Sequence, residues 1–316
     1  MSLADLAGQL VHHHIARTTR KTYQTGLKRF RRFCAARNLP MSSVDVDAIV
    51  HFLTDLFRCG LSRSTARVYL AGLSHLFRET ALHDLCGHEK VFHALAGYGR
   101  LCGKTLDHRL PITLDVMKFL KNQLGDSDLT NYSKRLYWCA FCFAFFGFLR
   151  IGEFLAPSTR VVGQLDHTLL FRNVTIDNAT SVTIHLLHSK SDMTGSGQTI
   201  HLNATGRTVC PVRACIKFLR VRPHRSRGRE DAFFVFPDAS YLCRQLVTAA
   251  MKRFLRPLEG SEHFGAHSFR IGAATTAAAN NCSDSAIQRA GRWKSNTYRG
   301  YIRPSNAGVA ILFYPT

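Results

Sequence analysis

The sequence is short of acidic side chains. It has 21 Asp and Glu against 42 Lys and Arg, a formal net charge of +21 in 316 residues. Residues 1–107 contain 15 basic and 8 acidic side chains and residues 108–316 contain 27 and 13, so no single basic tail explains the excess. A positive charge of this size favours a polyanionic partner, with nucleic acid the obvious one, and a merely soluble basic protein is the alternative.

Long apolar runs are also missing. The longest, residues 136–149, is too short to cross a bilayer and indicates a buried helix. The ten cysteines are scattered, and the pair Cys139 and Cys142 has no second pair at zinc-finger distance, so we expect buried free thiols. Three consecutive histidines, His12 to His14, suggest metal binding, but before a helix such a run is more often solvent-exposed. With no apolar stretch for a signal peptide, we expect an intracellular protein without a membrane segment.

The first part of the chain predicts a helical bundle. Over residues 18–101, four short helices place apolar side chains at helical spacing between basic ones. In the third helix we expect Val68, Leu70, Leu73 and Leu76 to face inward. Residues 103–112, rich in Gly, Lys, His, Arg and Pro, break the pattern and are the expected linker. The first domain is therefore a compact bundle over residues 1–106.

The rest of the chain, residues 107–316, predicts a mixed domain. Helical periodicity over residues 113–124 and 132–148 gives way to alternation rich in Thr, Val and Ile over residues 167–202, with Asp-Asn and Gly-Ser-Gly at the turns. Helical patterns resume at residue 211. The expected fold class is mainly α with a small antiparallel β-sheet, a helical domain followed by a mixed α+β domain.

Several side chains in the second domain suit phosphate chemistry. Arg150 ends an almost wholly apolar helix, where its charge needs an anionic partner. That partner is Glu153, one helical turn on, or a phosphate. His267 and Arg270 are three residues apart and hence neighbours on one helical face. Two aromatic residues follow at spacings of 23 and 8: Trp293 and Tyr301.

The segments GFLRIGEFL, HSKSD, HSFR, GRW and YIR occur in this order and together resemble the signature of the tyrosine recombinases, the phage-integrase superfamily. The exact sequence of the segment HSFRIGAATTAAA, followed by GRWKSN and YIR, is most similar to recombinases of tyrosine-recombinase retrotransposons (DIRS-type) and Crypton-type elements. The resemblance covers the whole chain. It implies a helical core-binding domain and a catalytic domain that cuts and rejoins DNA through a 3′-phosphotyrosyl intermediate, with no metal and no cofactor.

The resemblance also implies a role for each matching residue. Arg150 and Arg270 would clamp the non-bridging oxygens of the scissile phosphate, and Glu153 would orient the first arginine. His267 would assist the phosphate and the proton of the nucleophile. Trp293 stands where the family has histidine or tryptophan, and its indole N–H would donate to a phosphate oxygen.

The nucleophile and the general acid are assigned in the same way. Tyr301 would attack phosphorus, although it follows Trp293 one residue sooner than in bacterial and phage members, and Tyr298 is a rival. Lys190, after a predicted strand, would protonate the leaving 5′ oxygen, with Lys294 as the substitute.

The resemblance implies double-stranded DNA as the partner. Candidate contacts at predicted helix starts, with solvated surface as the alternative, are Thr19, Arg20, Lys21, Arg63, Ser64 and Arg67. The apolar tail over residues 309–316 would pack into a neighbouring subunit of a tetramer on DNA, or fold back on its own domain. An element of eukaryotic type implies the nucleus. The alternative functions are a domesticated DNA-binding protein without recombinase activity and a type IB topoisomerase.

Overall fold

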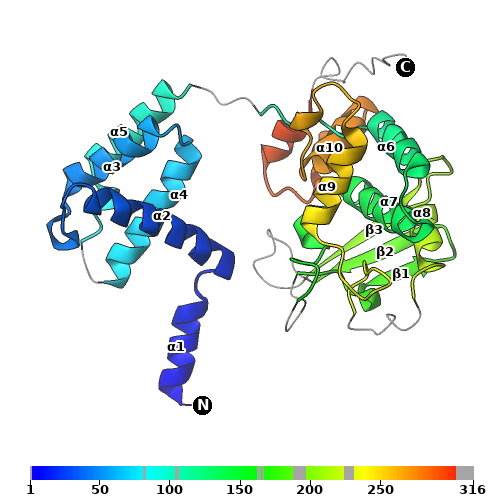
Figure 1. Ribbon diagram of the computed structural model, residues 1–316, viewed down its shortest axis with the longest axis horizontal. Helices are drawn as coiled ribbons and strands as arrows, with labels where there is room; N and C mark the ends of the chain where they lie inside the picture. The colour runs from blue at the N-terminus through cyan, green and yellow to red at the C-terminus, as the bar shows by residue number, and fades with distance from the viewer. Residues whose placement is uncertain are drawn as a thin grey trace. The chain divides into compact units, whose positions relative to one another are not determined.

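The computed structural model describes residues 2–80, 83–103, 107–161, 165, 167–187, 197–223 and 231–303. The chain divides into two compact units, residues 1–107 and residues 108–316. The boundary predicted from the sequence, after residue 106, lies one residue earlier. Figure 1 shows the helical first unit and the mixed second unit.

The described part of the first unit is wholly helical. Its elements are α1 (Leu3–His13), α2 (Arg17–Ala35), η1 (Met41–Ser43), α3 (Val46–Arg58), α4 (Arg63–Glu79), η2 (Leu85–Gly87) and α5 (Glu89–Leu101). The four predicted helices are therefore confirmed as α2 to α5, and α1 is an addition. Side-chain caps define two of the starts: Asp45 accepts a hydrogen bond from a backbone N–H of α3, and Ser62 does so for α4.

Two glycines bring α2 and α4 into close contact. A Cβ atom on Gly26 would lie 2.9 Å from the ring of Tyr69, and one on Gly72 would lie 3.1 Å from the Cα atom of Tyr23. A tyrosine of each helix therefore packs directly against a glycine of the other helix. A larger residue in place of either glycine would push the helices apart.

The buried face of α4 differs from the predicted one. Leu70 and Leu73 are buried as expected, together with Ala66 and Phe77, whereas Leu76 is only half-buried and Val68 is 37% exposed. The buried residues follow steps of four, three and four, the spacing of one helix face, and Val68 lies two positions away on the opposite side. The inward prediction for Val68 is wrong.

The second unit combines helices with one sheet. Its described elements are α6 (Leu114–Asp126), α7 (Asn131–Phe146), η3 (Ile151–Glu153), η4 (Phe171–Asn173), β1 (Val174–Asp177), β2 (Ser181–Leu186), β3 (Gln198–Asn203), α8 (Pro211–Leu219), α9 (Arg244–Leu255), η6 (Ser261–His263), α10 (Ser268–Ala279), α11 (Asp284–Gly291) and η7 (Asn296–Tyr301). The strands pair antiparallel in the order β1-β2-β3, with Val174 opposite Ile184 and Val182 opposite Leu202. The predicted fold class is confirmed.

Helix α7 is the centre of the second unit. Its residues 139–145 are all buried. Helices α8 and α10 pack against it, and α8 also packs against the sheet (Figure 1). Cys139 and Cys142 are buried free thiols as predicted, and burial raises the pKa of both. No described helix, α7 included, combines the length and the apolar content needed to cross a membrane.

The predicted linker, residues 103–112, extends too far toward the C-terminus. The backbone N–H groups of Leu110 and Ile112 donate to the carbonyls of His263 and Ser268, at 3.2 and 2.9 Å. These bonds join the segment to the end of η6 and to the start of α10, across more than 150 residues of sequence. Residues 110–112 therefore belong to the second unit and help to fix the helix that carries Arg270.

The closest contact in this region predicts a stability difference between two glycines. A Cβ atom on Gly272 would lie 1.8 Å from the Ile112 carbonyl oxygen, whereas one on Gly125 in α6 meets nothing within 4 Å. Because backbone cannot yield as a side chain does, Gly272→Ala should destabilise the second unit by about 1–3 kcal/mol. Gly125→Ala should be neutral or stabilise by up to about 1 kcal/mol.

Denaturant unfolding followed by tryptophan fluorescence measures this difference, since both tryptophans, Trp138 and Trp293, lie in the second unit. Equal midpoints for the two variants would contradict the close packing of α10 on residues 110–112.

Candidate active site

The turn after α7 forms one wall of the site. Helix α7 ends at Phe146, and the backbone of Phe148, two residues later, is left-handed with φ 49°. A bulky residue in this conformation is strained, and such strain gathers at functional sites. The turn directs two carbonyl oxygens to arginines from later in the chain. Arg270 Nη1 donates to Phe148, and Arg292 Nη1 donates to Gly147 at 3.0 Å.

A second left-handed turn ends α11 and explains the segment GRW. Arg292 has φ 57°, and a Cβ atom on Gly291 would lie 1.6 Å from the ring of Trp293. Only glycine therefore allows the indole to fold back over the end of the helix. The Gly291 carbonyl also accepts a hydrogen bond from Arg270 Nη2. The turn thus places two consecutive residues, Arg292 and Trp293, next to the Arg270 side chain.

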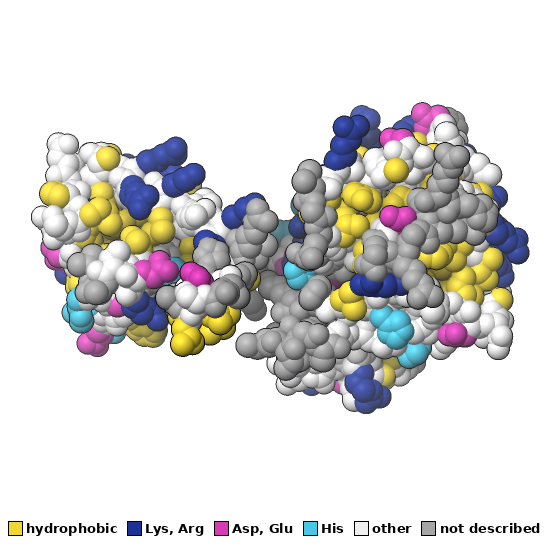
Figure 2. Space-filling model, turned by 90° about the horizontal axis from the view of Figure 1, so that it is seen from below, with side chains coloured by type: hydrophobic (Ala, Val, Ile, Leu, Met, Phe, Trp, Pro, Cys, Tyr) yellow, Lys and Arg dark blue, Asp and Glu magenta, His cyan; other side chains and the backbone are white. Residues whose placement is uncertain are grey.

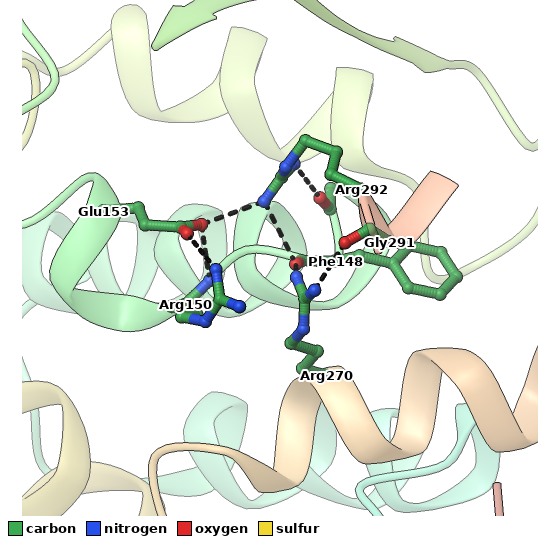
Figure 3. A network of polar contacts seen from close by, with 7 residues as sticks. Phe148, Arg150, Glu153, Arg270, Gly291 and Arg292 are labelled. Atoms are coloured by element: carbon green, nitrogen blue, oxygen red, sulfur yellow. Dashed lines mark hydrogen bonds and ion pairs between the residues drawn. The ribbon is translucent and has the colours of Figure 1, made fainter. Parts of the chain in front are cut away.

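Glu153 lies between two guanidinium groups (Figure 3). Its Oε1 atom pairs with Arg150 Nη1 at 2.5 Å and its Oε2 atom pairs with Arg292 Nη2 at 2.9 Å. Oε2 also accepts the backbone N–H of Arg150 at 3.0 Å, which fixes the carboxylate at the end of η3. The Glu153 side chain is only 6% exposed. The sequence predicted the pairing with Arg150 but missed Arg292.

Arg270 adds a third guanidinium to this cluster. It is 1% exposed and its Cζ atom lies 4.2 Å from the ring centre of Trp293. Burial, with help from Arg150 and Arg292, lowers the pKa of Arg270 to about 10, so it stays charged at neutral pH. Three guanidinium groups and one carboxylate leave two positive charges in excess among these residues. A site of this kind, largely shielded from water, favours an anion.

Two buried N–H donors at the same place have no hydrogen-bond partner among the described residues. They are Nε of Arg270 and Nε1 of Trp293. Buried donors are nearly always paired, so two unpaired donors beside an excess of positive charge need an explanation. An oxyanion that accepts from both provides one. Arg150, with a side chain 25% exposed, is the member of the cluster most open to solvent.

His267 lies beside the same cluster. It precedes α10 as its N-cap residue and is half-buried. Burial, followed by the charges of Arg109, Arg150, Arg244 and Arg270, lowers the pKa of His267 below its ordinary value of 6.5. The imidazole is therefore neutral at pH 7, and one of its nitrogens can accept a proton. Arg109 and Arg244 are further cations that the sequence did not single out.

Tyr301 is the last residue of η7 and faces Arg270. Its ring centre lies 5.0 Å from that of Trp293 and 5.6 Å from the Cζ atom of Arg270. Tyr301 is partly exposed, and its carbonyl accepts a hydrogen bond from Thr275 Oγ1 of α10 at 3.4 Å. The backbone of Tyr301 is thus tied to the helix that carries Arg270.

Tyr298, the rival nucleophile, has a different environment. It is 2% exposed, and its hydroxyl accepts a hydrogen bond from Arg299 Nε at 3.2 Å. Arg299 in turn pairs with Asp284 at 3.3 Å, on the exposed surface of α11. The Tyr298 hydroxyl is therefore engaged by a surface ion pair.

The structure thus brings together Arg150, Glu153, His267, Arg270, Trp293 and Tyr301. Lys190 lies outside the described residues, as does the tail over residues 309–316. Lys294, the possible substitute for Lys190 as general acid, is exposed.

The first unit gathers most of the predicted DNA contacts on one surface. Two adjoining hollows at the starts of α2 and α4 share Ser64 and are lined in addition by Lys21, Arg63 and Arg67. Thr19 and Arg20 lie in the first turns of α2 but line neither hollow. Arg100 of α5, which was not predicted, lines one of them. In Figure 2 several Lys and Arg side chains of this unit lie along one edge.

The environment of His267 predicts its titration. In the folded, DNA-free protein its pKa should lie below 6.5, because burial and the arginines penalise the charged form. Between that pKa and 6.5 the unfolded chain binds a proton that the folded chain does not. The free energy of unfolding should therefore fall as the pH drops through this interval, and His267 should contribute no change above it.

An NMR titration of the imidazole, with His267→Gln to identify the resonance, measures this pKa. Orthovanadate bound in the cluster should raise it by offsetting the positive charges. A pKa at or above 6.5 in the anion-free protein would contradict this view of the site.

Comparisons with known proteins agree with this architecture. Residues 3–85 match the family described as phage integrase, N-terminal SAM-like domain. No curated protein matches the sequence. Among solved structures, the XerH site-specific recombinase bound to palindromic difH substrate is 16% identical, covering 90% of this chain and 76% of its own, with a TM-score of 0.61.

Two further solved structures are similar over nearly their full length. The Tn1549 transposon integrase in complex with circular intermediate DNA is 14% identical, with coverages of 95% and 94% and a TM-score of 0.62. A lambda integrase dimer bound to a COC′ core site is 16% identical, with coverages of 95% and 94% and a TM-score of 0.59. The chain therefore has the tyrosine-recombinase fold, with a helical unit followed by a mixed unit that contains the arginine cluster.

Proposed function

We propose that this protein is a site-specific DNA recombinase or integrase that cuts and rejoins strands through a 3′-phosphotyrosyl intermediate. The observation that carries the proposal is the cluster of three guanidinium groups around Glu153, with the Tyr301 ring beside Arg270. A phosphodiester is an anion that fits the charge excess, and a phenol is a nucleophile that can attack it.

The reaction assigned to the site conserves the phosphodiester bond energy. The Tyr301 oxygen attacks phosphorus, its proton passes to a base, and the bond from phosphorus to the 5′ oxygen breaks. The products are a phosphotyrosyl ester at the 3′ end and a free 5′ hydroxyl. Attack by a 5′ hydroxyl from another strand reverses these steps and returns the phenol. No nucleotide cofactor is consumed, and no metal is assigned a role.

Each neighbour of the phosphate has one task. Arg150, Arg270 Nε and Trp293 Nε1 donate to the non-bridging oxygens, where negative charge builds up in the transition state. Neutral His267 accepts the phenol proton, since its lowered pKa keeps the imidazole unprotonated at pH 7. Lys190 protonates the leaving 5′ oxygen, an assignment that rests on the sequence resemblance alone.

Double-stranded DNA is the proposed partner. The solved structures with this fold are bound to difH substrate, circular intermediate DNA and a core site. The basic surface at the starts of α2 and α4 would contact phosphates of the duplex. We propose in addition a tetramer held by the tail over residues 309–316, membership of a DIRS-type or Crypton-type mobile element, and a nuclear location.

One observation favours a DNA-binding protein that does not cut. Both terminal nitrogens of Arg270 donate to backbone carbonyls, those of Phe148 and Gly291, so only Nε and one N–H group on each terminal nitrogen remain for a phosphate. A chain that keeps this arrangement on DNA would bind the phosphate without activating it. Covalent trapping separates the two functions.

The trapping substrate is a pool of nicked duplexes with randomised sequence, in which cleavage releases a short 5′-hydroxyl fragment and prevents religation. The wild-type chain should form a covalent adduct that is resistant to denaturation. Tyr301→Phe should abolish it, a loss of at least about 1,000-fold, because the Tyr301 ring lies beside the Arg270 guanidinium, whereas the Tyr298 hydroxyl accepts from Arg299. Tyr298→Phe, the matched control, should retain it.

Mass spectrometry of the trapped adduct identifies the modified tyrosine. No adduct from wild type, with DNA binding intact, would establish the binding-only function instead. An adduct that survives Tyr301→Phe would show that the nucleophile is misassigned.

A further inference from the structure

A cluster of metal-ligating side chains lies in the first unit, separate from the candidate active site in the second. His14 lies between α1 and α2, and His75 and Glu79 lie one turn apart on α4. One ligand atom from each residue falls within 4.8 Å of the other two. Residues four apart on a helix face the same side, so α4 presents an imidazole and a carboxylate together to His14.

The distances suit a small transition-metal ion. Tetrahedral bonds of about 2.0–2.1 Å place ligand atoms roughly 3.3 Å apart. His75 Nε2 and Glu79 Oε1 are already 3.2 Å apart. The His14 ring centre lies 5.3 Å from that of His75. Moving its imidazole by about 1.5 Å would complete a three-ligand site.

The surroundings of the cluster favour an ion there. The three residues line a hollow whose other walls include the apolar side chains of Leu10 and Ala71 and the ring of Tyr23. Apolar groups beside the ligands lower the local dielectric constant, which strengthens metal–ligand attraction on that side of the open hollow. Arg78 also lines the hollow, but its guanidinium is directed to Asp84, at 3.6 Å, and to Ser74. Its charge is therefore partly offset.

We propose that His14, His75 and Glu79 bind one divalent transition-metal ion, with zinc the best fit and water at the fourth position. Two imidazoles and one carboxylate are a zinc-type ligand set, whereas magnesium and calcium prefer oxygen ligands alone. The proposal departs from the metal-free expectation drawn from the sequence, although it assigns the ion no part in strand cleavage.

The ion would tie the α1–α2 junction to α4. Helix α1 exposes Leu3, Leu6 and Leu10, by 88%, 41% and 76%, so it buries little apolar surface in this unit. A metal bond from His14 to α4 supplies an attachment that apolar packing does not, since metal-binding free energy adds directly to the stability of the bound arrangement.

The test is a titration of the untagged 316-residue chain with Zn²⁺, and with Co²⁺ as a spectroscopic probe. Wild type should bind one ion per chain. His75→Ala and Glu79→Gln should each weaken binding at least tenfold. Glu79 has a side chain 56% exposed, so its substitution should leave the fold intact.

The chain offers a matched control on α5. Glu89 and His93 form another i,i+4 pair, 3.6 Å apart, that belongs to no described three-residue cluster. His93→Ala should therefore leave the affinity unchanged. Hydrogen exchange of residues 10–16 should slow when Zn²⁺ is added to wild type and to His93→Ala, but not to Glu79→Gln.

Three results would overturn the proposal. One is absence of stoichiometric binding to wild type. Another is an equal loss of affinity in His93→Ala and His75→Ala. The third is binding that persists in His75→Ala but disappears when His12 and His13 are replaced, because the histidine run alone would then account for it.

Discussion

Three guanidinium groups share one small volume of this protein because Glu153 lies among them. Its two oxygens pair with Arg150 and Arg292. Unpaired like charges about 5 Å apart would repel by about 3 kcal/mol per pair at an effective dielectric constant near 20. One carboxylate and several backbone carbonyls offset this repulsion without cancelling it. The free site is therefore stable enough to form and still carries a charge that a phosphodiester neutralises.

The backbone places these charges. Phe148 and Arg292 both adopt left-handed conformations, which cost about 1–2 kcal/mol each in residues other than glycine. Helix α7, buried over residues 139–145, ends just before the Phe148 turn, and tight packing of this kind offsets such a cost. In return, the Phe148 turn directs its carbonyl to Arg270, and the Gly291–Trp293 turn brings the indole over the same guanidinium. The two strained turns therefore fix the positions of the Arg270 guanidinium and the Trp293 indole, which are the donors of the site.

Periodicity and local spacing predicted the helices α2 to α5, the sheet and the pairing of Arg150 with Glu153, because these depend on residues near one another in sequence. The role of Arg292 was not predicted, because its partner Glu153 is 139 positions away and its left-handed turn has no signature in a single sequence. The end of the linker was misplaced for the same reason, since Leu110 bonds to a carbonyl at residue 263. The one available signal for Arg292 was its place between Gly291 and Trp293.

The central claim is that the arginine cluster receives the phosphodiester that Tyr301 attacks. The most direct measurement is a structure of the chain on DNA selected by covalent trapping, with orthovanadate bridging the cut strand ends. The account predicts vanadium bonded to the Tyr301 oxygen, with equatorial oxygens accepting hydrogen bonds from Arg150, Arg270 and Trp293. Vanadate bound away from these donors, or bonded to Tyr298, would contradict it.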